Sequence, residues 1–129
     1  MSNGKPVHGT FCWNELMTRD SEKAAEFYAE LIGWKVVDSG MPGFKYNLFK
    51  VDDYDAGGMM NMPPEIPAEV PPHWMAYIAV DNVDNLAQKT TELGGQLLHG
   101  PQDIPGVGRF CTIQDPTGGV VSLISFPDK

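Results

Sequence analysis

A short pattern of residues that occurs twice at one spacing constrains this chain more than any other feature. A Trp, a helix-capping Asp and a helix-ending Gly return 61 residues later: Trp13, Asp20 and Gly33 become Trp74, Asp81 and Gly94. The glycine pair at 57–58 corresponds to the pair at 118–119 at the same offset in the sequence. The sequence therefore predicts an internal duplication of about sixty residues, and two copies are too few for a solenoid.

Each copy shows the pattern of one strand, one helix and three further strands. The expected strands cover 10–18, 34–38, 44–51 and 56–62, then 74–80, 96–99, 109–114 and 120–126. In the first helix an apolar stripe recurs at helical spacing: Ala24, Phe27, Tyr28, Leu31 and Ile32. The second helix has a similar stripe: Val83, Leu86, Ala87, Thr90 and Leu93.

These patterns predict an α+β fold with two βαβββ modules in one domain that covers 1–129. The modules span 10–62 and 73–127. Five prolines fall within 63–72, so this segment is expected to be a stiff, extended connector.

Composition excludes several classes of function. A formal net charge of −8 disfavours nucleic acid and anionic membrane as partners, since both bind Lys and Arg. No apolar run reaches the roughly 18 residues of a membrane span, and the N-terminus lacks a signal-peptide core, so a cytoplasmic location is expected. Cys12 and Cys111 stand alone, which favours reduced packing thiols over a zinc site.

Two segments carry a resemblance to a known family. The segment EFYAELIGW follows Asp20, and DPTGGVVSLISF forms the C-terminal strand region. With the doubled βαβββ pattern, they resemble the vicinal oxygen chelate superfamily, which includes glyoxalase I, bleomycin resistance proteins and extradiol dioxygenases. The resemblance implies a curled mixed sheet around a cup that holds a ligand, and it implies a homodimer.

The resemblance also implies four metal-ligand positions on the first and last strands of the modules. They are Trp13, Asn61, Met75 (or Trp74 by the internal repeat) and Ser122. An indole is a donor only, a thioether is too soft, and a neutral amide or hydroxyl is a weak ligand. No metal and no cofactor are therefore expected. His73, beside the third position, is the alternative metal ligand.

Glu15 lies two residues from Trp13 on the same strand face, which the resemblance points into the cup. A carboxylate in an apolar cup could act as a base or anchor a ligand. The alternative is an ion pair with Arg19 or Arg109. Tyr77, on the Met75 face, is expected either to contact the ligand or to pack in the core.

The sequence thus predicts a protein that binds a small, largely apolar molecule without metal. The expected ligand-binding residues are Trp13, Glu15, Met75, Tyr77, Asn61 and Ser122. The alternative is an enzyme of the same superfamily: a metal-dependent or acid/base lyase, isomerase or dioxygenase with Glu15 as the candidate catalytic residue.

Overall fold

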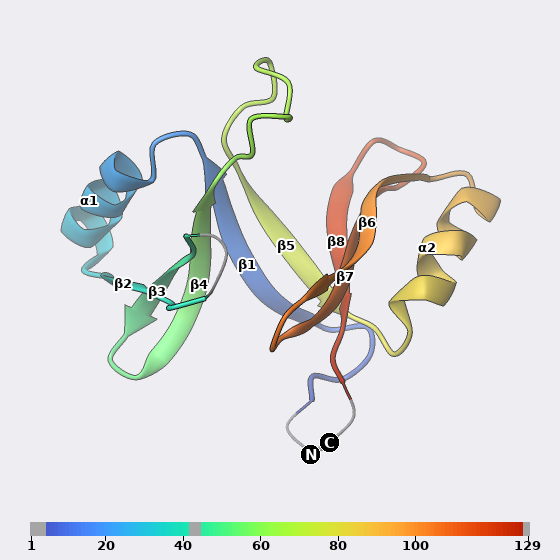
Figure 1. Cartoon of the computed structure of the whole chain (residues 1–129), viewed down its shortest axis with the longest axis horizontal. Helices are drawn as coiled ribbons and strands as arrows, with labels where there is room; N and C mark the ends of the chain where they lie inside the picture. The colour runs from blue at the N-terminus through green and yellow to red at the C-terminus, as the bar shows by residue number, and fades with distance from the viewer. Residues whose placement is uncertain (1–4, 42–44, 128–129) are drawn as a thin grey trace. The chain divides into compact units, whose positions relative to one another are not determined.

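A computed structural model describes residues 5–41 and 45–127 of the chain (Figure 1). The elements follow the predicted order twice: β1 (Phe11–Thr18), α1 (Ser21–Ile32), β2 (Lys35–Asp38), β3 (Asn47–Val51), β4 (Tyr54–Asn61), then β5 (His73–Ala79), α2 (Val83–Glu92), β6 (Gln96–Ile104), β7 (Gly108–Gln114) and β8 (Val120–Ser125). This order confirms the α+β class and the doubled βαβββ pattern.

The strands form a mixed sheet in the order β2-β3-β4-β1-β5-β8-β7-β6. β1 pairs with β4 in parallel and β5 pairs with β8 in parallel, whereas the hairpin neighbours are antiparallel. The chain divides into two compact units. We call Trp13–Met75 the α1 unit, and Met1–Cys12 with Ala76–Lys129 the α2 unit. β1 and β5 therefore each contribute residues to both units.

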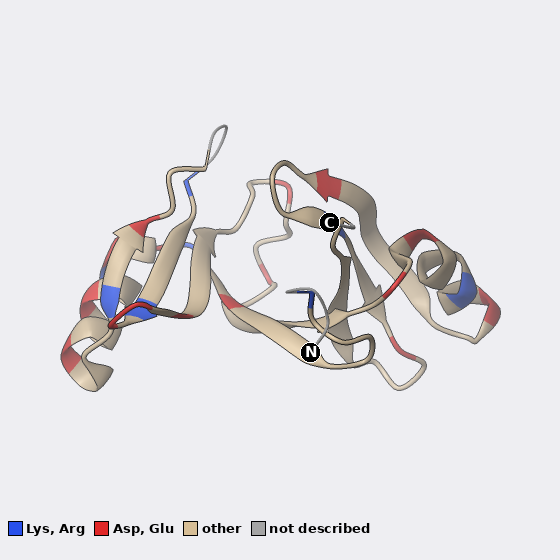
Figure 2. Cartoon of the chain, turned by 90° about the horizontal axis from the view of Figure 1, so that it is seen from below, with Lys and Arg blue, Asp and Glu red and all other residues tan. Residues whose placement is uncertain are grey.

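Acidic residues outnumber basic ones, 17 to 9, and they lie on both helices and on the loops (Figure 2). In the described part of the chain, no helix has the length and apolar character needed to cross a membrane.

The core of the α1 unit lies between α1 and the sheet. Leu16, Phe49 and Met59 are buried there, at 6%, 0% and 1% exposure. The rings of Tyr28 and Trp74 close over Phe49, with centroids 5.8 and 6.0 Å from its ring. Aromatic contacts of this kind add to the free energy gained from apolar burial.

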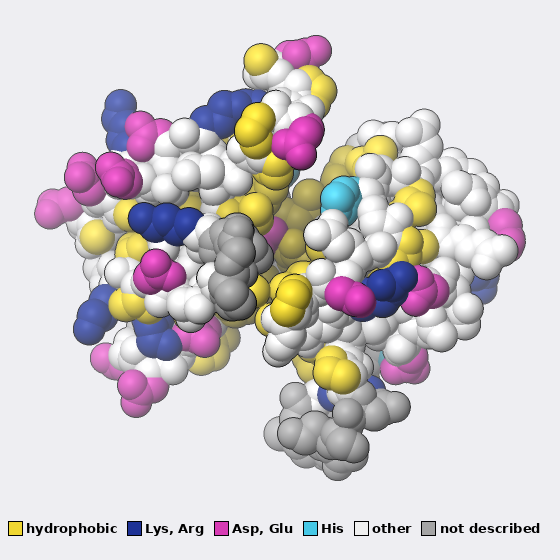
Figure 3. Space-filling view, viewed as in Figure 1, with side chains coloured by type: hydrophobic (Ala, Val, Ile, Leu, Met, Phe, Trp, Pro, Cys, Tyr) yellow, Lys and Arg dark blue, Asp and Glu magenta, His cyan; other side chains and the backbone are white. Residues whose placement is uncertain are grey.

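The apolar stripe predicted on α1 does not all face the core, which corrects the sequence-based expectation. Ala24 and Tyr28 pack against the core cluster, whereas Phe27, Leu31 and Ile32 remain 56%, 64% and 53% exposed. Only part of the predicted stripe meets the sheet, because Ala24 and Tyr28 reach the buried residues Leu16, Phe49 and Met59 while the other three side chains stay in solvent. Apolar and acidic side chains consequently lie together on the outside of α1 (Figure 3).

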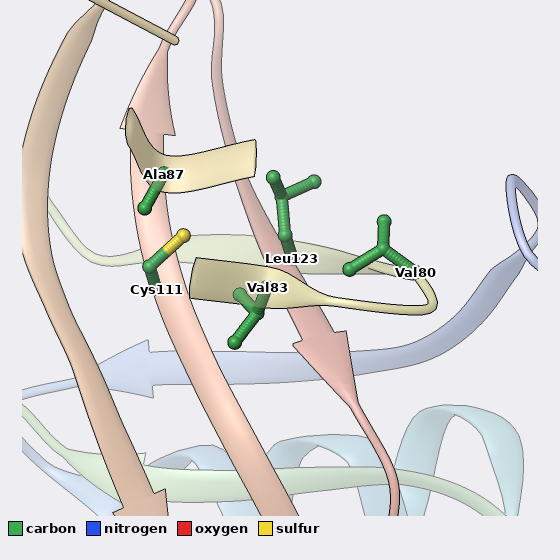
Figure 4. Close-up of a cluster of buried hydrophobic side chains, with 5 residues drawn as sticks. All are labelled: Val80, Val83, Ala87, Cys111 and Leu123. Carbon is green, nitrogen blue, oxygen red and sulfur yellow. The ribbon is translucent and has the colours of Figure 1, made fainter. Parts of the chain in front are cut away.

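The core of the α2 unit has the same design. Five buried residues pack between α2 and the strands β7 and β8: Val80, Val83, Ala87, Cys111 and Leu123 (Figure 4). Cys111 is fully buried there as a free thiol. Burial raises the pKa of this thiol, which suits a packing role.

The offset of 61 holds at the glycines that follow the helices, since Gly33 and Gly94 both have positive φ, of 89° and 93°, but it does not hold at the helix starts. The cap of α2 is Asn82, whose side chain accepts from the Asn85 N–H, and not Asp81. Since the α1 cap is Asp20, the offset at the caps is 62. With an offset of 62, Leu16 in the α1-unit core corresponds to Ile78, which packs against the α2-unit core. Trp13 then corresponds to Met75 and not to Trp74.

The last strands of the two units correspond to each other at a larger offset than the helix starts. The first helical N–H groups donate to a side chain of the last strand in both units: Ser21 N to Asn61 Oδ1 at 3.2 Å, and Val83 N to Ser125 Oγ at 2.7 Å. Asn61 therefore corresponds to Ser125, an offset of 64. The glycine pair at 57–58 lies within β4, whereas Gly118 is in the turn before β8 with φ of 102°.

One other expectation is changed. β6 does not end at His99 but continues to Ile104, with register irregularities before Gln102. The residues between the expected strands 96–99 and 109–114 are therefore strand as far as Ile104, and only 105–107 form a turn. The predicted start of a strand at Phe44 lies outside the described residues.

The helix cap gives a direct test of the corrected alignment. Replacing Asn82→Ala should destabilise the fold by about 1 kcal/mol, because the Asn85 N–H loses its acceptor. Asp81→Ala is the matched control and should change stability by less than about 0.5 kcal/mol. Urea denaturation of both variants measures the difference, and a larger loss for Asp81→Ala would contradict the assignment.

Candidate functional site

The sheet of the α1 unit has one face that α1 does not cover. Side chains alternate along each strand, so the neighbours of the core residues Leu16 and Phe49 point to this other face. Glu15 pairs with Gly58 on β4, and Gly58 pairs with Leu48 on β3, which places these three in one row. We call this the uncovered face of the α1 unit.

A directed chain of hydrogen bonds lies on this face. The Trp13 indole N–H donates to the Tyr46 hydroxyl at 2.8 Å, and the Tyr46 hydroxyl donates to Glu15 Oε1 at 2.8 Å. Because an indole can only donate, the phenol oxygen accepts a hydrogen bond from Trp13, and the phenol O–H donates to Glu15. Glu15 is only 6% exposed, so this bond offsets part of the cost of burying its carboxylate.

The environment keeps Tyr46 as a neutral phenol. Burial raises its pKa far above the ordinary value, and the nearby Glu15 carboxylate raises the pKa further. The Trp13 hydrogen bond acts in the opposite direction and is the weaker effect. Tyr46 is thus a fixed hydrogen-bond donor to Glu15 across the ordinary pH range.

Gly58 provides the space that Tyr46 occupies. A Cβ built on Gly58 would overlap the Tyr46 hydroxyl and ring. In the α2 unit the corresponding position is Ser122, since Tyr77 pairs with Ser122 as Glu15 pairs with Gly58. In the α1 unit, the Tyr46 hydroxyl next to the start of β3 therefore fills the space that a side chain of β4 would occupy.

Tyr77 and Ser122 come together in the α2 unit as cross-strand partners. Ser122 is fully buried and its hydroxyl lies 2.8 Å from the Thr112 hydroxyl. Tyr77 is 6% exposed, and its ring centroid lies 6.1 Å from that of Phe110. The structure thus places these two predicted residues side by side on β5 and β8.

The structure also places the other predicted site residues. Asn61 uses its amide oxygen to bind the Ser21 N–H at the start of α1. Met75 is half-buried in β5. His73 is also half-buried, with Nδ1 2.8 Å from the Pro71 carbonyl oxygen.

The two arginines suggested as partners of Glu15 bind elsewhere. Arg109 forms ion pairs with Asp84 and Asp103, each at 3.0 Å. Arg19 donates to the carbonyl groups of Val70 and Pro67 at 2.7 and 3.0 Å, which ties the proline-rich segment to the end of β1. The alternative of an ion pair between Glu15 and one of these arginines is therefore not found among the described residues.

The residues at the implied metal positions do not fit a divalent cation. The corrected alignment replaces Asn61 by Gly58 at the position that matches Ser122, so the set becomes an indole, a glycine, a thioether and a hydroxyl. None of these is a strong ligand. Over residues 5–41 and 45–127, no three His, Cys, Asp or Glu side chains come together as a potential metal site.

Sequence reasoning identified Trp13 and Glu15 but missed Tyr46. Tyr46 precedes β3, and nothing in its local pattern distinguishes it from an ordinary strand tyrosine. The available signal was Gly58, because a glycine inside a strand marks the close approach of another group.

Comparison with known proteins fixes the family. The model of the glyoxalase/bleomycin resistance protein/dioxygenase superfamily matches residues 10–123. The chain belongs to this superfamily. The family match confirms the resemblance that the two sequence segments indicated.

The chain matches two kinds of longer curated protein over part of their length. "Putative glyoxylase CFP32" of Mycobacterium bovis is 40% identical over 119 residues, which is 90% of this chain and 44% of that protein. "Anthracycline biosynthesis protein DnrV" of Streptomyces peucetius is 30% identical over 118 residues, 92% of this chain and 42% of that protein. The chain thus spans less than half the length of these relatives.

Solved structures share the fold at low identity. Methylmalonyl-CoA epimerase from Mycobacterium tuberculosis superposes with a TM-score of 0.63 at 17% identity, covering 99% of this chain and 94% of that one. An extradiol ring-cleaving dioxygenase from B. fuscum gives a TM-score of 0.62 at 15% identity, covering 99% of this chain and 35% of that one. At these identities the likeness concerns the fold alone.

The relation between Gly58 and Tyr46 can be tested by a mutant cycle. Gly58→Ala should cost about 1–3 kcal/mol, because the new methyl group overlaps the Tyr46 hydroxyl. In a Tyr46→Ala background the same Gly58→Ala change should cost less than about 0.5 kcal/mol, since the clashing group is gone. Denaturant unfolding of the four proteins measures the coupling, and additive effects would contradict the packing described.

Proposed function

We propose that this chain binds a small, largely apolar organic molecule on the uncovered face of the α1 unit, with Glu15 as the polar anchor. The observation that carries the proposal is the directed chain from Trp13 through Tyr46 to Glu15. A protein that needed Glu15 only for folding would gain more from an apolar residue, since burying a carboxylate is costly.

The surroundings of Glu15 support an apolar ligand. Strand alternation places Met17 on the same face of β1, Met60 on the same face of β4 and Leu48 on the same face of β3. Binding sites for small organic molecules combine such apolar walls with a few placed polar groups. Methionine side chains also adapt to ligands of different shape. Met75, Tyr77, Asn61 and Ser122 remain additional ligand-binding candidates from the sequence.

A second candidate function is acid/base catalysis by Glu15. A buried carboxylate fixed by a neutral phenol is suited to accept a proton from a carbon next to a carbonyl group. The relative named a glyoxylase and the structural neighbour named an epimerase are consistent with an enzyme of this kind. Under this alternative, Trp13 and Tyr46 position the base.

We further propose that either function proceeds without a metal. Metal affinity needs several deprotonated or imidazole ligands held together, and the implied positions offer an indole, a glycine, a thioether and a hydroxyl. Elemental analysis of protein purified without chelator should find less than about 0.1 equivalent of zinc, nickel, manganese or iron. One equivalent that disappears in His73→Ala would refute the metal-free proposal.

The main test is a ligand screen on the native protein and on Glu15→Gln. At about 100 times its dissociation constant, a ligand adds about 2.7 kcal/mol to stability, which thermal unfolding detects in a library of small metabolites. Glu15→Gln should weaken binding of any hit about tenfold, because it removes the charge from the anchoring hydrogen bonds. Isothermal titration measures this change.

Glu69→Gln is the matched control, because Glu69 is exposed and its replacement changes the net charge equally. A hit that binds Glu15→Gln as tightly as the native protein would exclude Glu15 as the anchor. The catalytic candidate is separated by proton NMR in deuterated water. Exchange of a C–H next to a carbonyl that is lost in Glu15→Gln supports catalysis, whereas binding without exchange supports a binding protein.

A further inference from the structure

The sheet of the α2 unit also has one face that its helix does not cover. The core residues Cys111 and Leu123 point towards α2, so their neighbours along each strand point to the opposite side. We call this side the uncovered face of the α2 unit. Cross-strand pairing places four polar side chains in one row on it: Tyr77, Ser122, Thr112 and His99.

This row differs in chemistry from its counterpart in the α1 unit. There the row that starts at Glu15 continues through Gly58, Leu48 and Val37, so a carboxylate is followed by apolar positions. In the α2 unit all four side chains form hydrogen bonds, and none is a carboxylate, an ammonium or a guanidinium group. The two rows therefore suit ligands of different chemistry.

Three rings lie in contact on the uncovered face of the α2 unit. The Phe110 ring is in the middle, with its centroid 6.1 Å from that of Tyr77 and 5.5 Å from that of His99. Phe110 is half-buried and His99 is exposed, so a ligand in solution can reach these rings. The face of an aromatic ring carries partial negative charge and attracts the slightly positive C–H groups of a saturated ring stacked on it.

The polar side chains beside Phe110 present donors and acceptors together. His99 Nε2 lies 2.6 Å from Gln102 Oε1, and because an amide oxygen only accepts, Nε2 carries the proton. His99 Nδ1 is then an acceptor, while the NH2 group of Gln102 is a donor. The Thr112 and Ser122 hydroxyls lie 2.8 Å apart. Since Ser122 is fully buried, Thr112 is the hydroxyl of this pair that a ligand can reach.

Charged side chains lie away from this face. Among the described residues of β5, β6, β7 and β8, no Asp, Glu, Lys or Arg shares the face with the row. Arg109 binds both Asp103 of β6 and Asp84 of α2, which places these charges on the helix side of the sheet. Asp115 accepts hydrogen bonds from N–H groups of its own turn. The face therefore favours an uncharged ligand.

We propose that the uncovered face of the α2 unit binds a neutral ring that carries several hydroxyl groups, such as a sugar residue, stacked on Phe110. Each hydroxyl of such a ring both donates and accepts, so neighbouring hydroxyls match the acceptor of His99 and the donor of Gln102. The C–H groups of the ring contact the aromatic side chains. This site lies on a different unit from Glu15 and does not depend on the ligand proposed there.

A single sugar ring should bind weakly. A methyl glycoside has about thirteen non-hydrogen atoms, and at an ordinary binding free energy per atom this size gives a dissociation constant of about 1 mM. Direct observation of the protein by NMR is suited to affinities in this range.

NMR titration of the full chain with the methyl glycosides of glucose, galactose, mannose and rhamnose, each to about 50 mM, tests the proposal. At least one glycoside should shift the side-chain resonances of Phe110 and Thr112 along a curve that saturates. Tetrahydropyran, the same ring without hydroxyl groups, should bind at least about tenfold more weakly, because the polar side chains then lose their partners.

Two variants separate stacking from hydrogen bonding. Phe110→Leu keeps an apolar side chain but removes the aromatic face, and it should weaken binding about fivefold. Gln102→Met keeps the length of the side chain but removes the amide, and it should weaken binding about tenfold. The matched controls are Phe27→Leu and Gln88→Met, which make the same changes at exposed positions of α1 and α2 and should bind like the native protein.

Thermal unfolding separates lost binding from lost folding. Gln102 and Gln88 are both exposed, so both methionine variants should unfold at the temperature of the native protein. A chain that binds none of the four glycosides would overturn the proposal. Tetrahydropyran that binds as tightly as the glycosides, or binding unchanged by both Phe110→Leu and Gln102→Met, would also overturn it. Binding that is lost in Glu15→Gln but kept in Phe110→Leu would place the sugar on the α1 unit and refute this site.

Discussion

Parallel pairing of the first and last strands organises each half of this protein. β1 lies beside β4 and β5 beside β8, so the chain must leave the first strand and return in the same direction. A parallel return needs a crossover, and the helix supplies it. Besides the strand pairing, Asn61 or Ser125 of the last strand accepts a hydrogen bond from the first N–H of the helix. This contact joins the start of the helix directly to the closing strand in each unit.

This closure determines what each face of the sheet can do. One face is covered by its helix and becomes apolar core, while the other keeps polar groups. In the α1 unit that second face holds Glu15, which accepts a hydrogen bond from Tyr46, and Tyr46 in turn accepts one from Trp13. In the α2 unit the matching row holds Tyr77, Ser122 and Thr112, which have no carboxylate, and the Ser122 and Thr112 hydroxyls are hydrogen-bonded to each other. The two halves share a backbone plan but differ in chemistry.

The sequence predicted the fold better than it predicted the site. Caps, turn glycines and strand alternation are local signals, so the order of elements and the face of Glu15 could be found without a structure. The register could not, because it depends on pairing between distant strands. The one-residue difference at the α2 cap means that Trp74 lies on the opposite face from Trp13. Tyr46 was missed because its role depends on the absence of a side chain at Gly58, on another strand.

The empty position at Gly58 has a consequence for how this protein can change. Since the Tyr46 ring occupies the space of a Gly58 side chain, residues 46 and 58 are not free to vary independently. A mutational route to a side chain at 58 must pass through a smaller residue at 46, and that step first removes the donor to Glu15. Residues 46 and 58 are therefore expected to change together. Sequences that retain the carboxylate chemistry should keep glycine at 58 whenever they keep an aromatic hydroxyl at 46.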